Sequence, residues 1–176
     1  IALHGNEEQK KKYLTRLSKG EIGAYSLSEA GAGTDAAALG CRAKISDDGS
    51  HYILNGEKMW VTNGKSANIY VLFAKDIDHP EYGDKRHGGT TAFIIDSEME
   101  GFSVGKKEEK LGIRSSDTCV LLLNNCKVPL ENVLKGSGNG FPIAMNALDN
   151  SRIGIAAQAL GIAQGAYEAA LNYAHE

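Results

Sequence analysis

Residues 27–35 read LSEAGAGTD and follow directly on a short run with strand character, Ala24 to Leu27. The glycines of such a turn let it fold tightly and bring its backbone close to a ligand. Taken literally, residues 31–36 match the relaxed dinucleotide fingerprint G-x-G-x-x-A. That fingerprint must open a helix within a βαβ unit, whereas here a hairpin pattern over residues 42–54 follows almost at once. The stretch therefore predicts a β domain and argues against a nicotinamide-binding Rossmann fold. Taken alone, it also fits a surface turn without a ligand.

The following hundred residues have the character of an antiparallel β domain, because short runs rich in Val, Ile, Tyr and Leu alternate with turn signals. Asp47-Asp48-Gly49 suits a hairpin loop, and Asn55-Gly56 indicates another turn. Residues 76–89 are interpreted as an exposed loop, and the charge run at residues 106–110 as a solvated turn. The expected strands are Ala24–Leu27, Arg42–Ser46, His51–Leu54, Lys58–Thr62, Ile69–Ala74, Thr91–Ile95 and Cys119–Leu123.

Helices are expected at both ends of the chain. Asn6 can cap a helix whose apolar stripe includes Tyr13 and Leu17 and which ends at Gly20. Residues 143–176 are rich in Ala, Leu, Ile and Gln and contain no proline, which favours helix. No capping glycine or proline closes this second pattern. We therefore expect the stretch to belong to a longer protein.

The composition argues against several classes of function. Of the 176 residues, 42% are hydrophobic and 23% charged, which is ordinary for a soluble globular protein. The formal net charge of -3 leaves no basic field for nucleic acid. No apolar run is long enough to cross a bilayer and no signal peptide is recognisable, so an intracellular protein is expected. The three cysteines and five histidines lack the spacings of metal or redox sites, so we expect reduced thiols and no metal.

A Trp and a Thr lie two residues apart in the sequence KMWVTNG that follows the Asn55-Gly56 turn. On a strand, Trp60 and Thr62 point to the same face, where a planar cofactor can use both. The indole can lie against a flat ring system, and the hydroxyl can donate to or accept from the ring edge. Packing in the core is the alternative interpretation of Trp60.

Four motifs together resemble the acyl-CoA dehydrogenase family, in the family's order: LSEAGAGTD, NGEKMWVTNG, KLGIRSSDT and LDNSRIGIAAQALGIAQGA. The resemblance covers nearly the whole chain and is strongest to short-chain and short branched-chain members. It implies an α+β fold with a central antiparallel β-barrel domain flanked by helices of two helical domains. The implied parts are the end of the N-terminal helical domain (1–22), the middle β domain with the flavin-binding face (23–131) and the start of the C-terminal helical domain (132–176).

The resemblance also implies an FAD site on the β domain. Ser28 would hydrogen-bond the pyrimidine side of the flavin ring and Thr62 would approach its N5 atom, while Thr34 would lie near the pyrophosphate and the CoA chain. Asp149 and Arg152 match the family's acyl-CoA contact segment. The implied cofactor-binding residues are Tyr25, Leu27, Ser28, Gly33, Thr34, Trp60, Val61 and Thr62, and the implied substrate-binding residues are Thr34, Asp149 and Arg152.

No catalytic residue is expected within this chain. Some family members place their catalytic glutamate just before the arginine that matches Arg152, but here that position is Ser151, which cannot act as a carboxylate base. In other members the glutamate lies far downstream, often in a Tyr-Glu-Gly-Thr sequence that this chain does not contain. Glu29 is interpreted as a structural hydrogen-bonding residue. We expect the chain alone to be inactive.

The resemblance implies that the parent enzyme oxidises an acyl-CoA thioester to the trans-2-enoyl-CoA, in fatty-acid or branched-chain amino-acid catabolism. Its electrons would pass to an electron-transferring flavoprotein. A homotetramer in the bacterial cytoplasm or mitochondrial matrix is expected. The alternatives are an acyl-CoA oxidase-like enzyme and a non-catalytic protein that binds flavin or CoA esters.

Overall fold

A computed structural model describes all residues from Ile1 to Glu176. The chain divides into two compact units, Ile1–Ile143 and Ala144–Glu176, and each is described by itself. The first unit contains the short N-terminal helices and all seven strands. The second consists of most of one long helix.

The N-terminal helical segment begins at the predicted cap. It comprises α1 (Glu7–Gln9), the π-helical turn η1 (Lys10–Leu14) and α2 (Thr15–Ser18). The Asn6 side chain accepts from the Gln9 N–H at 2.8 Å, and the Gln9 side chain accepts from the Asn6 N–H at 3.0 Å, which satisfies two amides of the first turn. Buried Tyr13 donates its hydroxyl proton to Asn132 at 2.9 Å. This bond fixes the helical segment to the 3-10 turn η2 (Leu130–Asn132).

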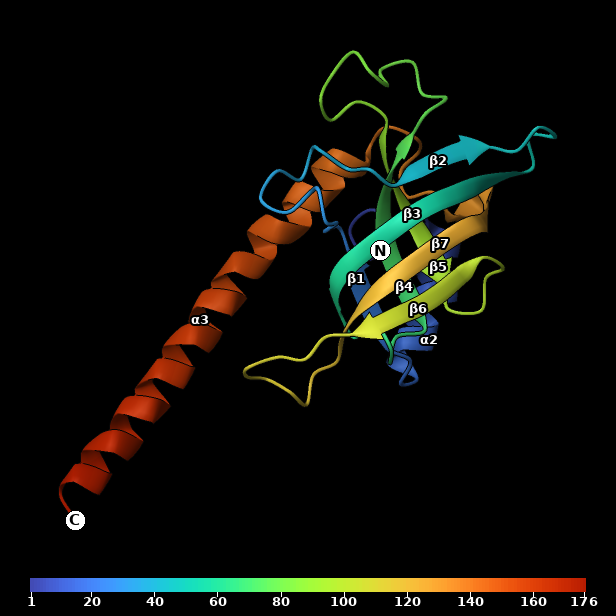
Figure 1. Cartoon of the computed structure of the whole chain (residues 1–176). Helices are drawn as coiled ribbons and strands as arrows, with labels where there is room; N and C mark the ends of the chain where they lie inside the picture. The colour runs from blue at the N-terminus through green and yellow to red at the C-terminus, as the bar shows by residue number, and fades with distance from the viewer. The chain divides into compact units, whose positions relative to one another are not determined.

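The seven strands form one sheet that curls around its core (Figure 1). The strand order is β1-β4-β2-β3-β7-β6, and β5 lies off this path and pairs with β4. Most pairs are antiparallel, as predicted, but β4 runs parallel to both β1 and β2. The strands are β1 (Gly23–Ser26), β2 (Arg42–Ile45), β3 (His51–Thr62), β4 (Ile69–Asp76), β5 (Thr90–Asp96), β6 (Phe102–Lys107) and β7 (Thr118–Pro129).

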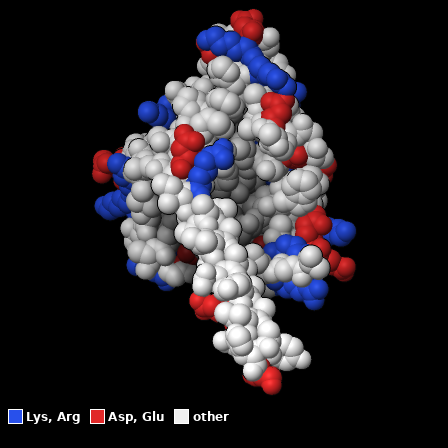
Figure 2. Space-filling model, turned by 90° about the vertical axis from the view of Figure 1, so that its left-hand side faces the viewer, with Lys and Arg blue, Asp and Glu red and all other residues white.

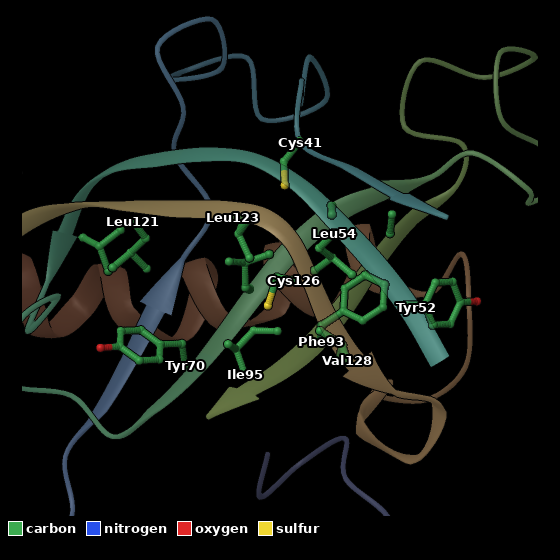
Figure 3. Close-up of a cluster of buried hydrophobic side chains, with 14 of the residues drawn as sticks. Cys41, Tyr52, Leu54, Tyr70, Phe93, Ile95, Leu121, Leu123, Cys126 and Val128 are labelled. Carbon is green, nitrogen blue, oxygen red and sulfur yellow. The ribbon is translucent and has the colours of Figure 1, made fainter. Parts of the chain in front are cut away.

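The core lies on the concave side of the sheet and draws side chains from most of its strands (Figure 3). Tyr52 and Phe93 meet edge to face with ring centroids 5.1 Å apart. All three cysteines are free thiols, as expected, and all three are buried. The residues labelled in the figure are Cys41, Tyr52, Leu54, Tyr70, Phe93, Ile95, Leu121, Leu123, Cys126 and Val128.

Two sequence-based assignments were wrong. Asn55-Gly56 is not a turn but lies inside β3, which runs without a break from His51 to Thr62 and pairs with β7. Gly56 has φ +140°, and a Cβ there would stand 2.9 Å from the Cα of Cys41, so the glycine permits a bulge and a close approach rather than a reversal. Lys106 and Lys107, expected in a turn, are the end of strand β6, which was not predicted.

The long helix α3 (Gly140–Ala174) confirms the helix predicted from residue 143. Within the second unit its apolar side chains, among them Ile153 and Leu160, are exposed. Figure 2 shows that the surface of this helix carries few charges. None of the helices, α3 included, combines the length and apolar character that crossing a bilayer requires.

Candidate functional site

The glycine-rich turn after β1 lies directly against the end of β3. The Met59 N–H donates to the Ser28 carbonyl oxygen at 3.0 Å. The Lys58 ammonium donates to the Leu27 carbonyl oxygen at 3.1 Å. These bonds bring together residues 25–34 and 58–62, and we call the surface formed by these two segments the shelf.

Trp60 and Thr62 point to the exposed side of the shelf, with buried Val61 between them. The Trp60 side chain is 61% exposed, so core packing is not its role. Its φ of +57° is rare for a bulky residue and strains the backbone. A register shift between Lys58 and Val61 explains this conformation, because the bulge places both of these side chains inward although they are three residues apart. A strained, exposed indole is typical of a functional position.

A buried ion pair supports the shelf from beneath. The Lys58 ammonium lies 2.5 Å from the Glu29 carboxylate, and the two side chains are 0% and 7% exposed. The same carboxylate accepts the Cys41 N–H at 3.2 Å and also the Gly40 N–H. Burial lowers the pKa of Lys58, and its interactions with Cys41 and Glu29 oppose that shift. All the contacts of Glu29 are therefore structural, in agreement with its interpretation from sequence.

The tip of the turn has room beside it. Neither Gly31 nor Gly33 has a left-handed φ, and nothing lies within 4 Å of a Cβ placed on either one. Ala32 between them is buried, and its backbone exchanges two hydrogen bonds with that of Glu29, at 3.0 and 3.1 Å. The fold itself thus requires no glycine at residues 31 and 33, and the open space is available to a ligand.

The third motif, KLGIRSSDT, contacts the turn that follows β3. The Asp117 carboxylate, from KLGIRSSDT, accepts the Lys65 N–H at 3.1 Å and the Ser66 hydroxyl at 2.8 Å. The Asn63 N–H donates to the Asp117 carbonyl oxygen at 3.1 Å, and the Asn63 side chain donates to the Gly23 carbonyl oxygen at 3.2 Å. The third motif therefore fixes the turn after Thr62 through Asp117, and the Asn63 side chain of that turn binds the start of β1.

All eight predicted cofactor residues lie within the two segments that form the shelf, and two of them turn their side chains inward. Leu27 is 7% exposed and Val61 is 2% exposed, so only their backbone can reach a ligand. Tyr25 packs its ring against that of Phe73, with centroids 5.2 Å apart. The other five, Ser28, Gly33, Thr34, Trp60 and Thr62, are wholly or partly exposed.

Asp149 and Arg152, predicted to contact substrate, belong to the second unit of the chain. The Arg152 Nε atom lies 3.8 Å from a carboxylate oxygen of Asp149, one helical turn away. Both side chains are about three-quarters exposed, at 75% and 76%. Ser151 donates its hydroxyl proton to the Leu148 carbonyl oxygen at 2.9 Å, as an ordinary helical serine does.

Residues that support the shelf were missed from the sequence, chiefly Lys58, Asn63 and Asp117. All three lie within the recognised motifs, but the sequence alone did not show that their side chains support the shelf. No group of three or more His, Cys, Asp or Glu side chains is arranged to hold a metal ion.

Comparison with known proteins identifies the family. The family model described as acyl-CoA dehydrogenase, middle domain, matches residues 24–126, and that of the C-terminal domain matches residues 138–176. The chain belongs to the acyl-CoA dehydrogenase family. This confirms the resemblance seen in the motifs, and the curled sheet with its helices confirms the predicted fold class.

Relatives of this acyl-CoA dehydrogenase segment include a short-chain specific acyl-CoA dehydrogenase of Clostridium acetobutylicum, which is 51% identical over 98% of the chain and 44% of its own length. Butyryl-CoA dehydrogenase from Megasphaera elsdenii has a similar structure, with a TM-score of 0.85 and 47% identity over 93% of this chain and 42% of that one. An acyl-CoA dehydrogenase from Bacillus anthracis, solved with FAD, has a TM-score of 0.77 and 40% identity over 85% of this chain and 25% of that one. The segment thus spans less than half the length of these relatives.

Proposed function

We propose that the complete protein is an FAD-dependent acyl-CoA dehydrogenase acting on short-chain acyl-CoA thioesters. The observation that carries the proposal is the shelf, where an exposed, strained Trp60 and the exposed Thr62 stand beside a glycine turn with open space. A flat ring system fits such a surface, because it can cover the indole and approach the turn closely. The names of the similar enzymes, short-chain acyl-CoA dehydrogenase and butyryl-CoA dehydrogenase, support the substrate class.

Each exposed residue of the shelf has a proposed role toward FAD. Thr62 offers a hydroxyl donor to the edge of the ring, and Ser28 offers a second one from the turn. Donors that are already held in place stabilise charge that develops on the ring without reorganising during the reaction. Gly33 and Thr34 contact the phosphate end of the cofactor, and Trp60 covers one face of the ring. Bound FAD would supply the two-electron acceptor, which no side chain of this segment can provide.

Parts of the machinery outside the shelf are also proposals. Arg152 and Asp149 contact the acyl-CoA, and the carboxylate base comes from another position of the complete protein, because Ser151 cannot abstract a proton as a carboxylate does. Residues 1–22, 23–131 and 132–176 belong to the N-terminal helical, middle and C-terminal helical domains. An electron-transferring flavoprotein accepts the electrons, and the enzyme is a homotetramer in the bacterial cytoplasm or mitochondrial matrix.

The test is a visible spectrum of the purified complete protein before and after a short acyl-CoA is added without oxygen. A flavin band that bleaches with substrate is the expected result. A protein without a flavin band would refute the proposal, and a band that substrate does not bleach would indicate a non-catalytic binding protein. Turnover that proceeds with oxygen alone would indicate an oxidase. Thr62→Ala should slow bleaching, while Thr15→Ala, an exposed threonine on α2, serves as the control.

A further inference from the structure

We propose that the buried Glu29–Lys58 ion pair is a positioning device that holds the turn at residues 27–34 in the conformation that receives FAD. The inference rests on the proposed function of the shelf. Neither side chain reaches the exposed surface, so the pair would act only through the backbone that it holds.

The contacts of the pair close the base of the whole loop between β1 and β2. Lys58, on β3, holds the near end of the loop through the Leu27 carbonyl oxygen at 3.1 Å. Glu29 holds the far end through the N–H groups of Gly40 and Cys41. The 2.5 Å contact between the two side chains joins these anchors. The loop is thereby fixed at both ends, while Gly31 and Gly33 at the tip of the turn stay open.

Stability alone does not account for this arrangement. Burying two charges carries a desolvation penalty, and a well-packed apolar pair of similar volume is often as stable or more so. The bulge in β3 that turns Lys58 inward is the same bulge that forces Trp60 into its strained, exposed conformation. One backbone irregularity thus builds both the rim of the shelf and the support beneath it. Such coupling is expected if the pair serves the geometry of the site.

The experiment compares the double variant Glu29→Gln/Lys58→Met with the wild type in the complete protein. This variant is chosen because either single change leaves an unpaired buried charge. The amide oxygen of the introduced glutamine can still accept the Gly40 and Cys41 N–H groups, so the double change removes chiefly the side-chain link from the loop to β3, and the backbone bond from Met59 to Ser28 remains. Tyr52→Phe is the control, because it removes the buried 2.9 Å hydrogen bond from Tyr52 to Asp76. Tyr52 lies on β3 like Lys58, about 20 Å from it along the strand.

Two measurements are needed: hydrogen exchange of the Glu29 and Ala32 amides, whose hydrogen bonds close the turn, in the flavin-free protein, and the Kd for FAD from quenching of flavin fluorescence. We expect exchange at least tenfold faster at these amides, with β4 and β5 unchanged, and a Kd about tenfold higher, because only a fraction of molecules would hold the receptive conformation. Tyr52→Phe should leave both quantities unchanged even if its melting temperature falls.

Wild-type exchange in the double variant would overturn the proposal, and so would faster exchange with an unchanged Kd. A lower melting temperature with neither effect would show that the pair is only structural. If the wild type binds no FAD at all, the proposed function fails, and the exchange data alone then decide whether the pair holds the turn.

Discussion

Gly33→Ala should make the flavin-free protein slightly more stable and should also lower its affinity for FAD. Gly33 has no left-handed φ, and no atom outside its immediate chain neighbours lies within 4 Å of the added Cβ. An alanine at a compatible glycine position stabilises a protein by about 0.4–1 kcal/mol, because the unfolded chain loses conformational freedom. For a protein of this size the melting temperature should rise by roughly 1–4 °C.

The effect on FAD has the opposite sign. If the cofactor approaches the backbone at Gly33, the new methyl group occupies space that the cofactor needs. Overpacking of this kind costs about 1–3 kcal/mol, which corresponds to a Kd roughly 5- to 150-fold higher. Thermal unfolding of the flavin-free protein and a fluorescence titration with FAD measure the two effects separately.

A matched control is Gly49→Ala in the hairpin turn between β2 and β3. Gly49 also has open space but has φ +71°, so alanine there should lower stability by about 1 kcal/mol and leave the FAD affinity unchanged. If Gly33→Ala instead destabilises the flavin-free protein, the glycine is required by the fold. An unchanged Kd would show that no ligand approaches the turn at this position, and either result refutes the reasoning.

Three further changes test other parts of the structure. Burial raises the pKa of the Cys41 thiol from 9.0 to about 11, so this thiol should lower the free energy of unfolding by about 2 kcal/mol as pH rises from 9 to 11, because it ionises first in the unfolded chain; urea unfolding of Cys41→Ala should show a smaller loss than the wild type over that interval. Gly101→Ala should cost more than about 3 kcal/mol in the same assay, because Gly101 has φ +85° and its Cβ would stand 2.5 Å from the Asn124 carbonyl oxygen. FAD should quench tryptophan emission in the wild type and should quench it much less in Trp60→Phe, since the exposed indole at residue 60 is the only one in this segment.

Most elements of the fold could be predicted because their signals are local. The Asn6 cap and the runs of β-branched residues act through neighbours in sequence, and both predictions were confirmed. The bulge at Gly56 could not be predicted, because its cause is contact with Cys41, which lies fifteen residues earlier and just before another strand. The parallel pairing of β4 with β1 and β2 was missed for the same reason, since strand order depends on packing across the sheet. Strand β6 was not predicted, because its exposed lysines resemble those of a solvated turn.

The shelf shows why sequence reasoning finds the rim of a site more easily than its support. Trp60 and Thr62 stand out because an alternating pattern places an aromatic ring and a hydroxyl on one face, and the structure keeps both on that face. The same pattern also places Lys58 on that face, where a lysine would be solvated, yet it is fully buried. Only the register shift after Lys58 reverses its direction. That shift costs backbone strain at Trp60 and leaves a charge to be compensated by Glu29. Two unfavourable features that arise from one irregularity are expected where a fold gives up stability to shape a binding surface.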